Sequence, residues 1–468
     1  MPEERQEELF IAADAVGALD NPFYAALDKL LRKRGFDAFA EETCREFYAE
    51  RMGRPDLPPG VYFRMLMVGY LEGIGSERGI AWRCRDSISL REFLGYGLAK
   101  TAPEHSTLSK TRKRLSLEAH GAVFGWMLEV LQESGLLKGK TVGVDSTTLE
   151  ANAAMRAIVR RDDGTEYDAW LEQLAAAAGI ETPTRQDLAK LDRKRPKKGS
   201  NQDWKHPHDP EARITKMKDG RTRLAHKLEQ AVDMDTGAVV AVTVQTMDGG
   251  DTASLPNTLD EAERRLAEAG AEPEEVVADK GYHSNAAMTG VSERGLRTYV
   301  SEPNRGRRKW KGKRDAQKAT YGNRRRIRGE RGKRLLHERG ERLERTFAHH
   351  LVSGGMRRVH VRGQGEIRKR MLVHSAAFNL GLLMRKRFGF GTPRSLQGPA
   401  AAAAALGDAH AHGLAAAFRL IRRILGLLGP QVGSLRPSLR SLHNNTAIPR
   451  PSPLTQPAPR WGTSSTDC

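Results

Sequence analysis

The sequence predicts an α+β multidomain protein, in which an all-α N-terminal domain (residues 1–135) precedes a mixed α/β core (residues 136–390). Two observations support this division. Apolar residues recur at helical spacing through most of the first part, whereas short runs rich in β-branched residues begin at residue 141. From 391 to 468 the chain is rich in alanine and then in proline and serine, so we expect this tail to be disordered.

The chain is strongly basic. Its 468 residues include 77 lysines and arginines against 58 aspartates and glutamates, a formal net charge of +19. Such a charge attracts polyanions, of which nucleic acid is the commonest, although many ribosomal and membrane-surface proteins are equally basic. The polar start "MPEERQEELF" is unlike a signal peptide, and no stretch reaches the roughly 18 apolar residues of a membrane span. Cys44, Cys84 and Cys468 show no metal-binding spacing. We therefore expect a soluble, cytoplasmic protein without a membrane partner.

The N-terminal domain carries start and stop signals of helices. Asn21 is a candidate N-cap, Pro22 stands at the first helical position, and Gly35 ends the segment. The same pattern recurs in "PPGVYFRMLMVGYLEG" and in "SLEAHGAVFGWMLEVLQESG". Between these two, "SERGIAWRCRDSISLREFLGYG" predicts two short helices with a turn near Asp86, and a helix-turn-helix motif is one interpretation of them.

The core begins with a strand run, residues 141–144, that Asp145 ends. Residues 150–220 are predicted to be an insertion of two amphipathic helices and a polar segment, "RKRPKKGSNQDWKHPHDP", that is too rich in proline and lysine to be core. "RLAHKLEQAV" and "AVVAVTVQ" then flank the turn "DMDTG", which predicts a β-hairpin. A helix from Thr252 to Ala269 leads to the strand "EEVVAD", which ends at Asp279, and a short helix and the strand "LRTYVS" follow.

A second insertion, about 303–335, is the most basic tract of the chain. A run of charges is usually a solvated or disordered loop, but the interleaved Trp310 and Tyr321 favour contact with a nucleic-acid backbone and occasional stacking. Helical periodicity resumes at "LLHERGERLERTFAHHL". "KRMLVHSAAFNLGLLMRKRFG" predicts an apolar helix that closes the core, with Asn379 as a hydrogen-bonded core amide.

Two predicted strands end in aspartates, Asp145 and Asp279, which the intervening hairpin and helix would place in one sheet. A third acid on a following helix would complete a metal site; Glu344 is the leading candidate and Glu341, one helical turn away, its nearest competitor. Converging carboxylates raise each other's pKa unless cations neutralise them. Oxygen ligands without cysteine or clustered histidine suit Mg²⁺ or Mn²⁺. Two such ions activate a water or 3′-hydroxyl and stabilise the leaving oxygen of a phosphodiester.

Other polar residues have competing interpretations. Tyr282 and His283 either touch DNA or pack the turn between strand and helix. The adjacent His349 and His350 point to different faces of a helix, which favours the helix surface over a metal site. Asp251 is expected to cap the helix that follows it.

Three blocks of the sequence resemble the catalytic blocks of DDE transposases from bacterial insertion sequences: "TVGVDSTTLEAN", "VVADKGYHS" and the stretch that begins "ERTFAHHLVSGGMRRVHVRG". Residues 103–115 are similar to the segment that precedes the catalytic domain in that family. The resemblance covers roughly residues 15–390. It implies that Asp145, Asp279 and Glu344 are the DDE triad on a ribonuclease H-like fold, with two divalent ions, cutting DNA at element ends and joining the 3′-hydroxyls to a target.

The resemblance also implies the partners of the protein. These are double-stranded DNA, as terminal inverted repeats and as target, and a second copy of the chain in a homodimer on DNA near the nucleoid, with the N-terminal domain serving DNA-end binding or dimer contacts. The Tyr-x2-Arg-x3-Glu-x6-Lys signature of many relatives is replaced here by His337, Gly340 and Leu351, so its DNA contacts are not transferred. The basic side chains that we expect to contact DNA are Arg307, Arg308, Lys309, Arg324, Arg325, Arg326, Arg339, Arg342 and Arg345.

Two other functions remain open from the sequence. One is a catalytically inactive, transposon-derived protein that still binds DNA. The other is a nuclease that cleaves DNA without joining it. The first predicts salt-sensitive binding without metal-dependent nicking, and the second predicts nicking without a strand-transfer product.

Overall fold

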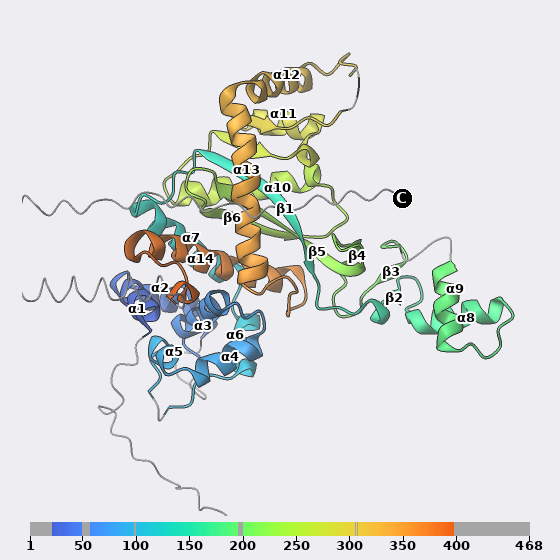
Figure 1. The fold of residues 1–468 in the computed structure, drawn as a ribbon, viewed down its shortest axis with the longest axis horizontal. Helices are drawn as coiled ribbons and strands as arrows, with labels where there is room; N and C mark the ends of the chain where they lie inside the picture. The colour runs from blue at the N-terminus through green and yellow to red at the C-terminus, as the bar shows by residue number, and fades with distance from the viewer. Residues whose placement is uncertain are drawn as a thin grey trace, which may run out of the picture. The chain divides into compact units, whose positions relative to one another are not determined.

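The computed structural model describes residues 21–48, 57–97, 100–194, 200–304, 306 and 308–396 (Figure 1). Of the predicted disordered tail, residues 397–468 lie outside the described residues, and so does Arg307. Residues 391–396 are described and include the short helix η6 (Pro393–Leu396), so the prediction of disorder is wrong for this first part of the tail. None of the helices in these ranges is long and apolar enough to cross a membrane.

The N-terminal part is helical, as predicted. Asn21 caps the first helix by accepting a hydrogen bond from the Phe23 N–H (3.0 Å), and Ser87 alone separates the two short helices predicted near Asp86. The elements are α1 (Pro22–Lys33), α2 (Phe36–Cys44), η2 (Arg45–Phe47), α3 (Pro59–Glu72), α4 (Glu77–Asp86), α5 (Ile88–Phe93), α6 (His105–Arg114) and α7 (Leu117–Glu133).

Arg64 of α3 ties these helices together. Its side chain is 4% exposed and pairs with Asp28 of α1 (2.7 Å) and Asp37 of α2 (2.8 Å). It also donates to the Phe93 carbonyl at the end of α5 (3.1 Å). A buried guanidinium is stable only when its donors are paired, so this one residue fixes the mutual positions of four helices.

A mixed sheet forms the core, in the order β4-β5-β1-β7-β8, with β6 also paired to β5. β1 lies at its centre, antiparallel to β5 on one side and parallel to β7 on the other. The predicted hairpin is β5–β6, with Gly237 at φ +78° in its turn. The strands are β1 (Thr141–Glu150), β4 (Arg213–Lys216), β5 (Thr222–Asp233), β6 (Val239–Gln245), β7 (Glu275–Ala278) and β8 (Arg297–Val300).

Helices pack on the sheet and connect its strands. α14 contacts β6 and also α7 and α3, so it joins the sheet to the N-terminal helices, while α13 crosses β1, β7 and β8 (Figure 1). The elements are α10 (Asp251–Glu268), η4 (Lys280–Tyr282), α11 (Asn285–Glu293), α12 (Arg314–Arg328), α13 (Glu330–Ala348), the π-helix η5 (His349–Ser353), α14 (Gln364–Phe388) and η6 (Pro393–Leu396).

The first insertion forms the two predicted helices and a small core of its own. Contrary to the prediction, its polar segment contributes to that core: Trp204 is 3% exposed and packs with Tyr167 and Trp170. Aromatic packing outweighs the polar surroundings because one buried indole removes a large apolar area from water. The elements are η3 (Met155–Ala157), β2 (Val159–Arg160), α8 (Tyr167–Ala177), α9 (Arg185–Lys194) and β3 (Trp204–Lys205).

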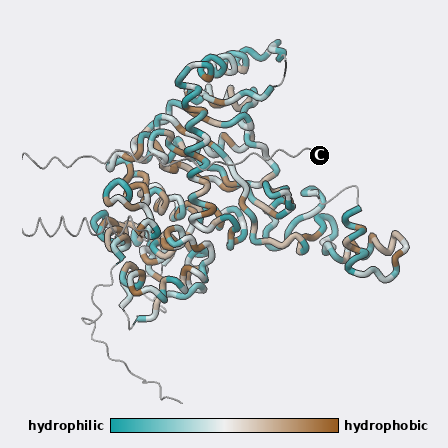
Figure 2. Tube along the Cα trace, in the orientation of Figure 1, coloured by the Kyte–Doolittle hydropathy of each residue, from teal (hydrophilic) through white to brown (hydrophobic). Residues whose placement is uncertain are grey.

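From residue 314 on, the second insertion is helical and not the loop that its charge run suggests. α12 occupies residues 314–328 and contacts β8 and α11, and α13 begins directly after it. Figure 2 shows both helices as predominantly hydrophilic. They are ordered by a few apolar contacts and by ion pairs to acids of the core, which a count of charges does not reveal.

Two buried asparagines bond the outer strands of the sheet. Asn379 of α14 accepts from the Val239 N–H (3.0 Å) and donates to the Val239 carbonyl (2.8 Å) in β6. Asn323 of α12 makes the same pair of bonds with Val300 of β8 (3.0 and 2.7 Å). Each side-chain amide thus replaces one residue of a neighbouring strand, and the prediction that Asn379 is a hydrogen-bonded core amide is confirmed.

Replacing Asn379 by leucine should lower the free energy of unfolding by about 2–4 kcal/mol, because it leaves the buried Val239 N–H and carbonyl without partners. Urea unfolding followed by circular dichroism measures the change. The exposed Asn257 of α10 offers a control, and Asn257→Leu should change stability by less than about 0.5 kcal/mol. Equal stability of the two variants would contradict the structural role of Asn379.

Candidate active site

The pairing of β1 with β7 brings the two predicted aspartates side by side. Val144 lies opposite Ala278, the last residue of β7, so Asp145 and Asp279 follow at the next position of adjacent parallel strands. Asp279 ends its strand, as predicted. The prediction that Asp145 ends a strand is wrong, because β5 continues to pair with β1 as far as Glu150.

Asp145 is held from two sides. One carboxylate oxygen accepts from the Ser146 N–H (2.8 Å), and the other accepts from Arg339 Nη1 of α13 (2.9 Å). Burial raises the pKa of Asp145, and the nearby charge of Asp279 adds to the rise, while Ser146 and Arg339 oppose it. The two aspartates therefore interact electrostatically.

Asp279 is partly exposed and shapes the turn after β7. Its Oδ1 accepts from the Gly281 N–H (2.7 Å) and caps η4. Within the described ranges, Asp279 forms no ion pair with a lysine or arginine, unlike Asp145. Its charge thus faces solvent at the carboxyl end of β7.

Asp251 lies close to Asp279 at this edge of the sheet. The prediction that Asp251 caps the following helix is wrong. Gly250 is the N-cap residue of α10, and Asp251 instead binds Lys227 Nζ (2.6 Å) and Ser146 Oγ (3.0 Å). A Cβ atom on Gly281 would lie 2.6 Å from Asp251 Oδ2 and 3.0 Å from Asp279 Oδ1. Asp251 thus pairs with a buried lysine of β5 and not with backbone amides of its own helix, a contact that no local pattern reveals.

A buried hydrogen-bond network lies next to Asp251 and its partner Lys227. Glu229 of β5 is fully buried and accepts from the Tyr282 hydroxyl (2.7 Å) and Ser254 Oγ (2.8 Å). Tyr282 and His283 are both fully buried, so the interpretation that they pack the turn is confirmed and direct DNA contact is excluded in this conformation. His283 lies near Arg308, which reaches its ring at 3.4 Å.

Glu344 lies on the exposed surface of α13, as does Glu341, which pairs with Arg345 (2.6 Å). The residue of α13 that contacts Asp145 is Arg339. Positions 339 and 344 lie about 140° apart around an α-helix, so the two side chains leave different faces. The structure brings Asp145 and Asp279 together and does not bring Glu344 into contact with them.

The basic residues predicted to bind DNA fall into two groups. Some are engaged within the fold: Arg308 and Arg324 both pair with Glu302 (2.9 and 2.6 Å), and Arg326 donates to the Thr298 carbonyl (2.9 Å). Arg339 is also engaged, with Asp145, and the exposed Arg345 pairs with Glu341. Lys309 and Arg325 are exposed, and Arg342 is half-buried.

His350 is fully buried, so the prediction of a helix-surface position is wrong for this residue. Its ring nitrogens lie 3.0 Å from Gln230 Nε2 and 3.3 Å from Ser375 Oγ. The π-helix that begins at His349 alters which side chains face the core. Burial lowers the pKa of His350 to about 3, so this ring is neutral and belongs to the core.

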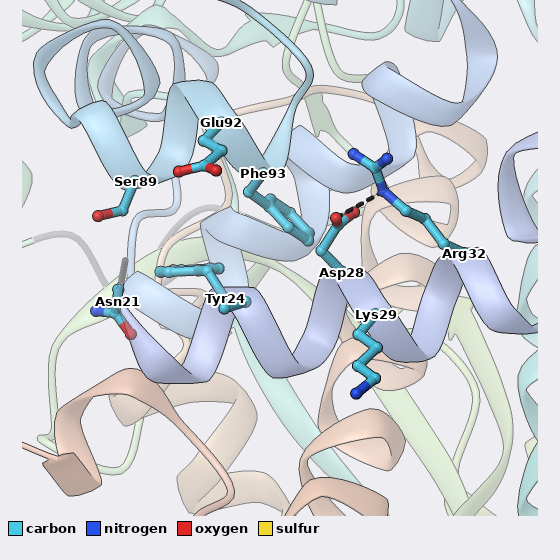
Figure 3. A pocket seen from close by; sticks show the side chains of 9 residues that line it. Asn21, Tyr24, Asp28, Lys29, Arg32, Ser89, Glu92 and Phe93 are labelled. Carbon is cyan, nitrogen blue, oxygen red and sulfur yellow. Dashed lines mark ion pairs between the residues drawn. The ribbon is translucent and has the colours of Figure 1, made fainter. Parts of the chain in front are cut away.

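A pocket of about 430 Å³ lies between α1 and α5, away from the carboxylates (Figure 3). Its lining is polar at one side, where Asp28 pairs with Arg32 (2.6 Å). Asp28 also binds Arg64, as described above, so its charge already serves the helical packing. We therefore place the candidate active site at the carboxylates and not at this pocket.

The carboxylates fit a hard divalent cation by their chemistry. Asp145, Asp251 and Asp279 offer only oxygen donors, as Mg²⁺ and Mn²⁺ prefer. The missing side chain of Gly281 leaves space between two of them. In the described residues, no three acidic, histidine or cysteine side chains converge as a preformed metal cluster; Arg339 and Lys227 supply the positive charge at Asp145 and Asp251.

Two regions of the chain match models of known protein families. Residues 14–114 match the model of a transposase domain (DUF772), and residues 201–380 match the model of a transposase DDE domain. The second match contains Asp251, Asp279 and Glu344 and begins after Asp145. A comparison with curated proteins finds no match. The two matched regions cover the helical part and most of the sheet, and both point to transposition of DNA: the chain belongs to the DDE transposases.

Proposed function

We propose that this transposase cuts DNA at the ends of an insertion sequence and joins the 3′-hydroxyls to target DNA in a reaction that requires Mg²⁺ or Mn²⁺. The observation that carries the proposal is the placement of Asp145 and Asp279 on adjacent parallel strands. The strand order β6-β5-β1-β7-β8, with only the last three parallel, supports a ribonuclease H-like core. The exposed carboxyl end of β7 offers DNA access to both acids.

In this proposal, Asp145, Asp279 and Glu344 hold the ions. Divalent ions supply charge neutralisation and activation of the attacking oxygen. A water attacks the phosphodiester at the element end, breaks its P–O3′ bond and releases a 3′-hydroxyl. This hydroxyl then attacks a target phosphodiester and displaces a 3′-hydroxyl of the target strand. Arg339 orients Asp145 and offers a guanidinium donor to a DNA phosphate. The role of Glu344 rests on the resemblance of "ERTFAHH" to the family motif, since its side chain is exposed on α13.

Asp145→Asn, Asp279→Asn and Glu344→Gln should each reduce strand cleavage and joining by at least about 100- to 1,000-fold, because each removes a carboxylate charge that holds the divalent ions at the reacting phosphate. A gel assay with element-end DNA and Mg²⁺ measures nicked and joined products. DNA affinity should stay unchanged in all three variants.

Glu341→Gln is the matched control for Glu344, because both acids are exposed on α13. It should retain activity. If Glu341→Gln were inactive and Glu344→Gln active, the third acid would be Glu341. Full cleavage by Asp145→Asn would contradict the proposed mechanism, and binding without any metal-dependent cleavage in the unmodified chain would favour the inactive DNA-binding protein.

We also propose that the N-terminal helices bind the DNA ends and that two copies act together on DNA. Trp82 of α4 is 65% exposed, although it is a large aromatic residue. The basic residues Arg78 and Arg85 flank it at helical spacing and share a surface pocket with it. The same pocket contains the acids Asp86 and Glu104, and Glu104 pairs with Arg85 (3.6 Å). An exposed indole between two guanidinium groups suits phosphate contact combined with stacking on a base.

Trp82→Ala should weaken binding to element-end DNA by about 10-fold, the usual loss when one aromatic–base stack is removed. Fluorescence anisotropy with labelled terminal DNA measures the affinity at several salt concentrations. Val352→Ala serves as control, because Val352 is similarly exposed (60%) but lies in η5. Equal affinity of both variants would exclude the α4 surface as a DNA contact.

A further inference from the structure

Asp251 is held in a fixed orientation at the end of the sheet. Lys227 Nζ (2.6 Å) and Ser146 Oγ (3.0 Å) both bind its Oδ1 atom. Lys227 itself is 4% exposed, and it also donates to Ser254 Oγ (2.7 Å). With one oxygen bound by buried partners, the side chain directs its other oxygen, Oδ2, toward Gly281.

Lys227 does not neutralise Asp251 completely. Its ammonium group lies 3.7 Å from the carboxylate of Glu229, which is fully buried. The other partners of Glu229 are the neutral hydroxyl groups of Tyr282, Ser254 and Thr258. One positive charge is therefore shared by two carboxylates, and negative charge remains at Asp251.

That charge faces a second carboxylate. A Cβ atom on Gly281 would lie within 3.0 Å of oxygens from both Asp251 and Asp279. Asp279 forms no ion pair among the described residues. Two carboxylates that meet with less than one compensating cation repel each other, and a bound cation removes this repulsion.

We propose that Asp251 is an additional metal ligand of this transposase and that it holds a divalent cation together with Asp279. The inference rests on the proposed function, and it adds an acid from the start of α10 to those of β1, β7 and α13. Carboxylate oxygens alone suit Mg²⁺ or Mn²⁺. Lys227 and Ser146 are then positioning residues, because they act through Asp251.

Mn²⁺ binding to the full-length protein, measured without DNA by the electron paramagnetic resonance of free Mn²⁺, tests the proposal apart from catalysis. Asp251→Asn should weaken binding by about 10-fold or more, as the loss of a ligand or its support does. Asp248→Asn is the matched control: it removes the same charge from the turn just before α10, where Asp248 pairs with Arg213, and should leave Mn²⁺ affinity unchanged.

A second pair of variants tests the geometry without changing charge. Gly281→Ala places a methyl group between Asp251 and Asp279 and should also weaken Mn²⁺ binding. The φ of Gly281 is not positive, so alanine fits its backbone. Gly290→Ala in α11 meets no atom within 4 Å and should bind Mn²⁺ normally. Circular dichroism checks that all four variants are folded.

The outcomes separate this inference from the proposed function. Loss of Mn²⁺ binding in Asp279→Asn and in Asp251→Asn supports both. Loss in Asp145→Asn and Asp279→Asn with wild-type binding in Asp251→Asn and Gly281→Ala overturns the role of Asp251 and leaves the proposed function standing. Wild-type Mn²⁺ binding in all of these variants contradicts the metal centre itself.

Discussion

The parallel pairing of β1 with β7 is the constraint on which the arrangement of this transposase depends. It aligns Asp145 with Asp279 over only four paired positions, from Thr141 to Val144. β5 pairs with the other edge of β1 from Val142 to Glu150, so the central strand continues past Asp145. Because backbone hydrogen bonds set this register, the two aspartates lie at corresponding positions of neighbouring strands.

The local features of the fold could be predicted from the sequence. The Asn21 cap, the Gly237 turn and the strand before Asp279 depend on neighbouring residues, and each is found where the pattern indicates. The length of β1 could not be predicted, because it is set by β5, about eighty residues away along the chain. The partner of Asp251 was missed for the same reason, since Lys227 comes from β5.

The sequence does not show which charged residues are exposed and which are paired or buried within the fold. The basic tract suggests a mobile DNA-binding loop, yet Glu302 binds two of its arginines and Thr298 a third. Conversely, the polar residues His226, Lys227, Glu229 and Gln230 of β5 are all buried, although polar side chains of a strand usually face solvent. Only the pairing of distant segments decides which charges stay free for a partner.

The asparagine bonds at Val239 and Val300 affect how two copies of the chain can meet. Free backbone groups on an outer strand invite a strand from another molecule to pair with them. Here the side chains of Asn379 and Asn323 already occupy these groups, and α14 and α12 lie over them. A strand from a second copy therefore cannot pair with the sheet at these two positions.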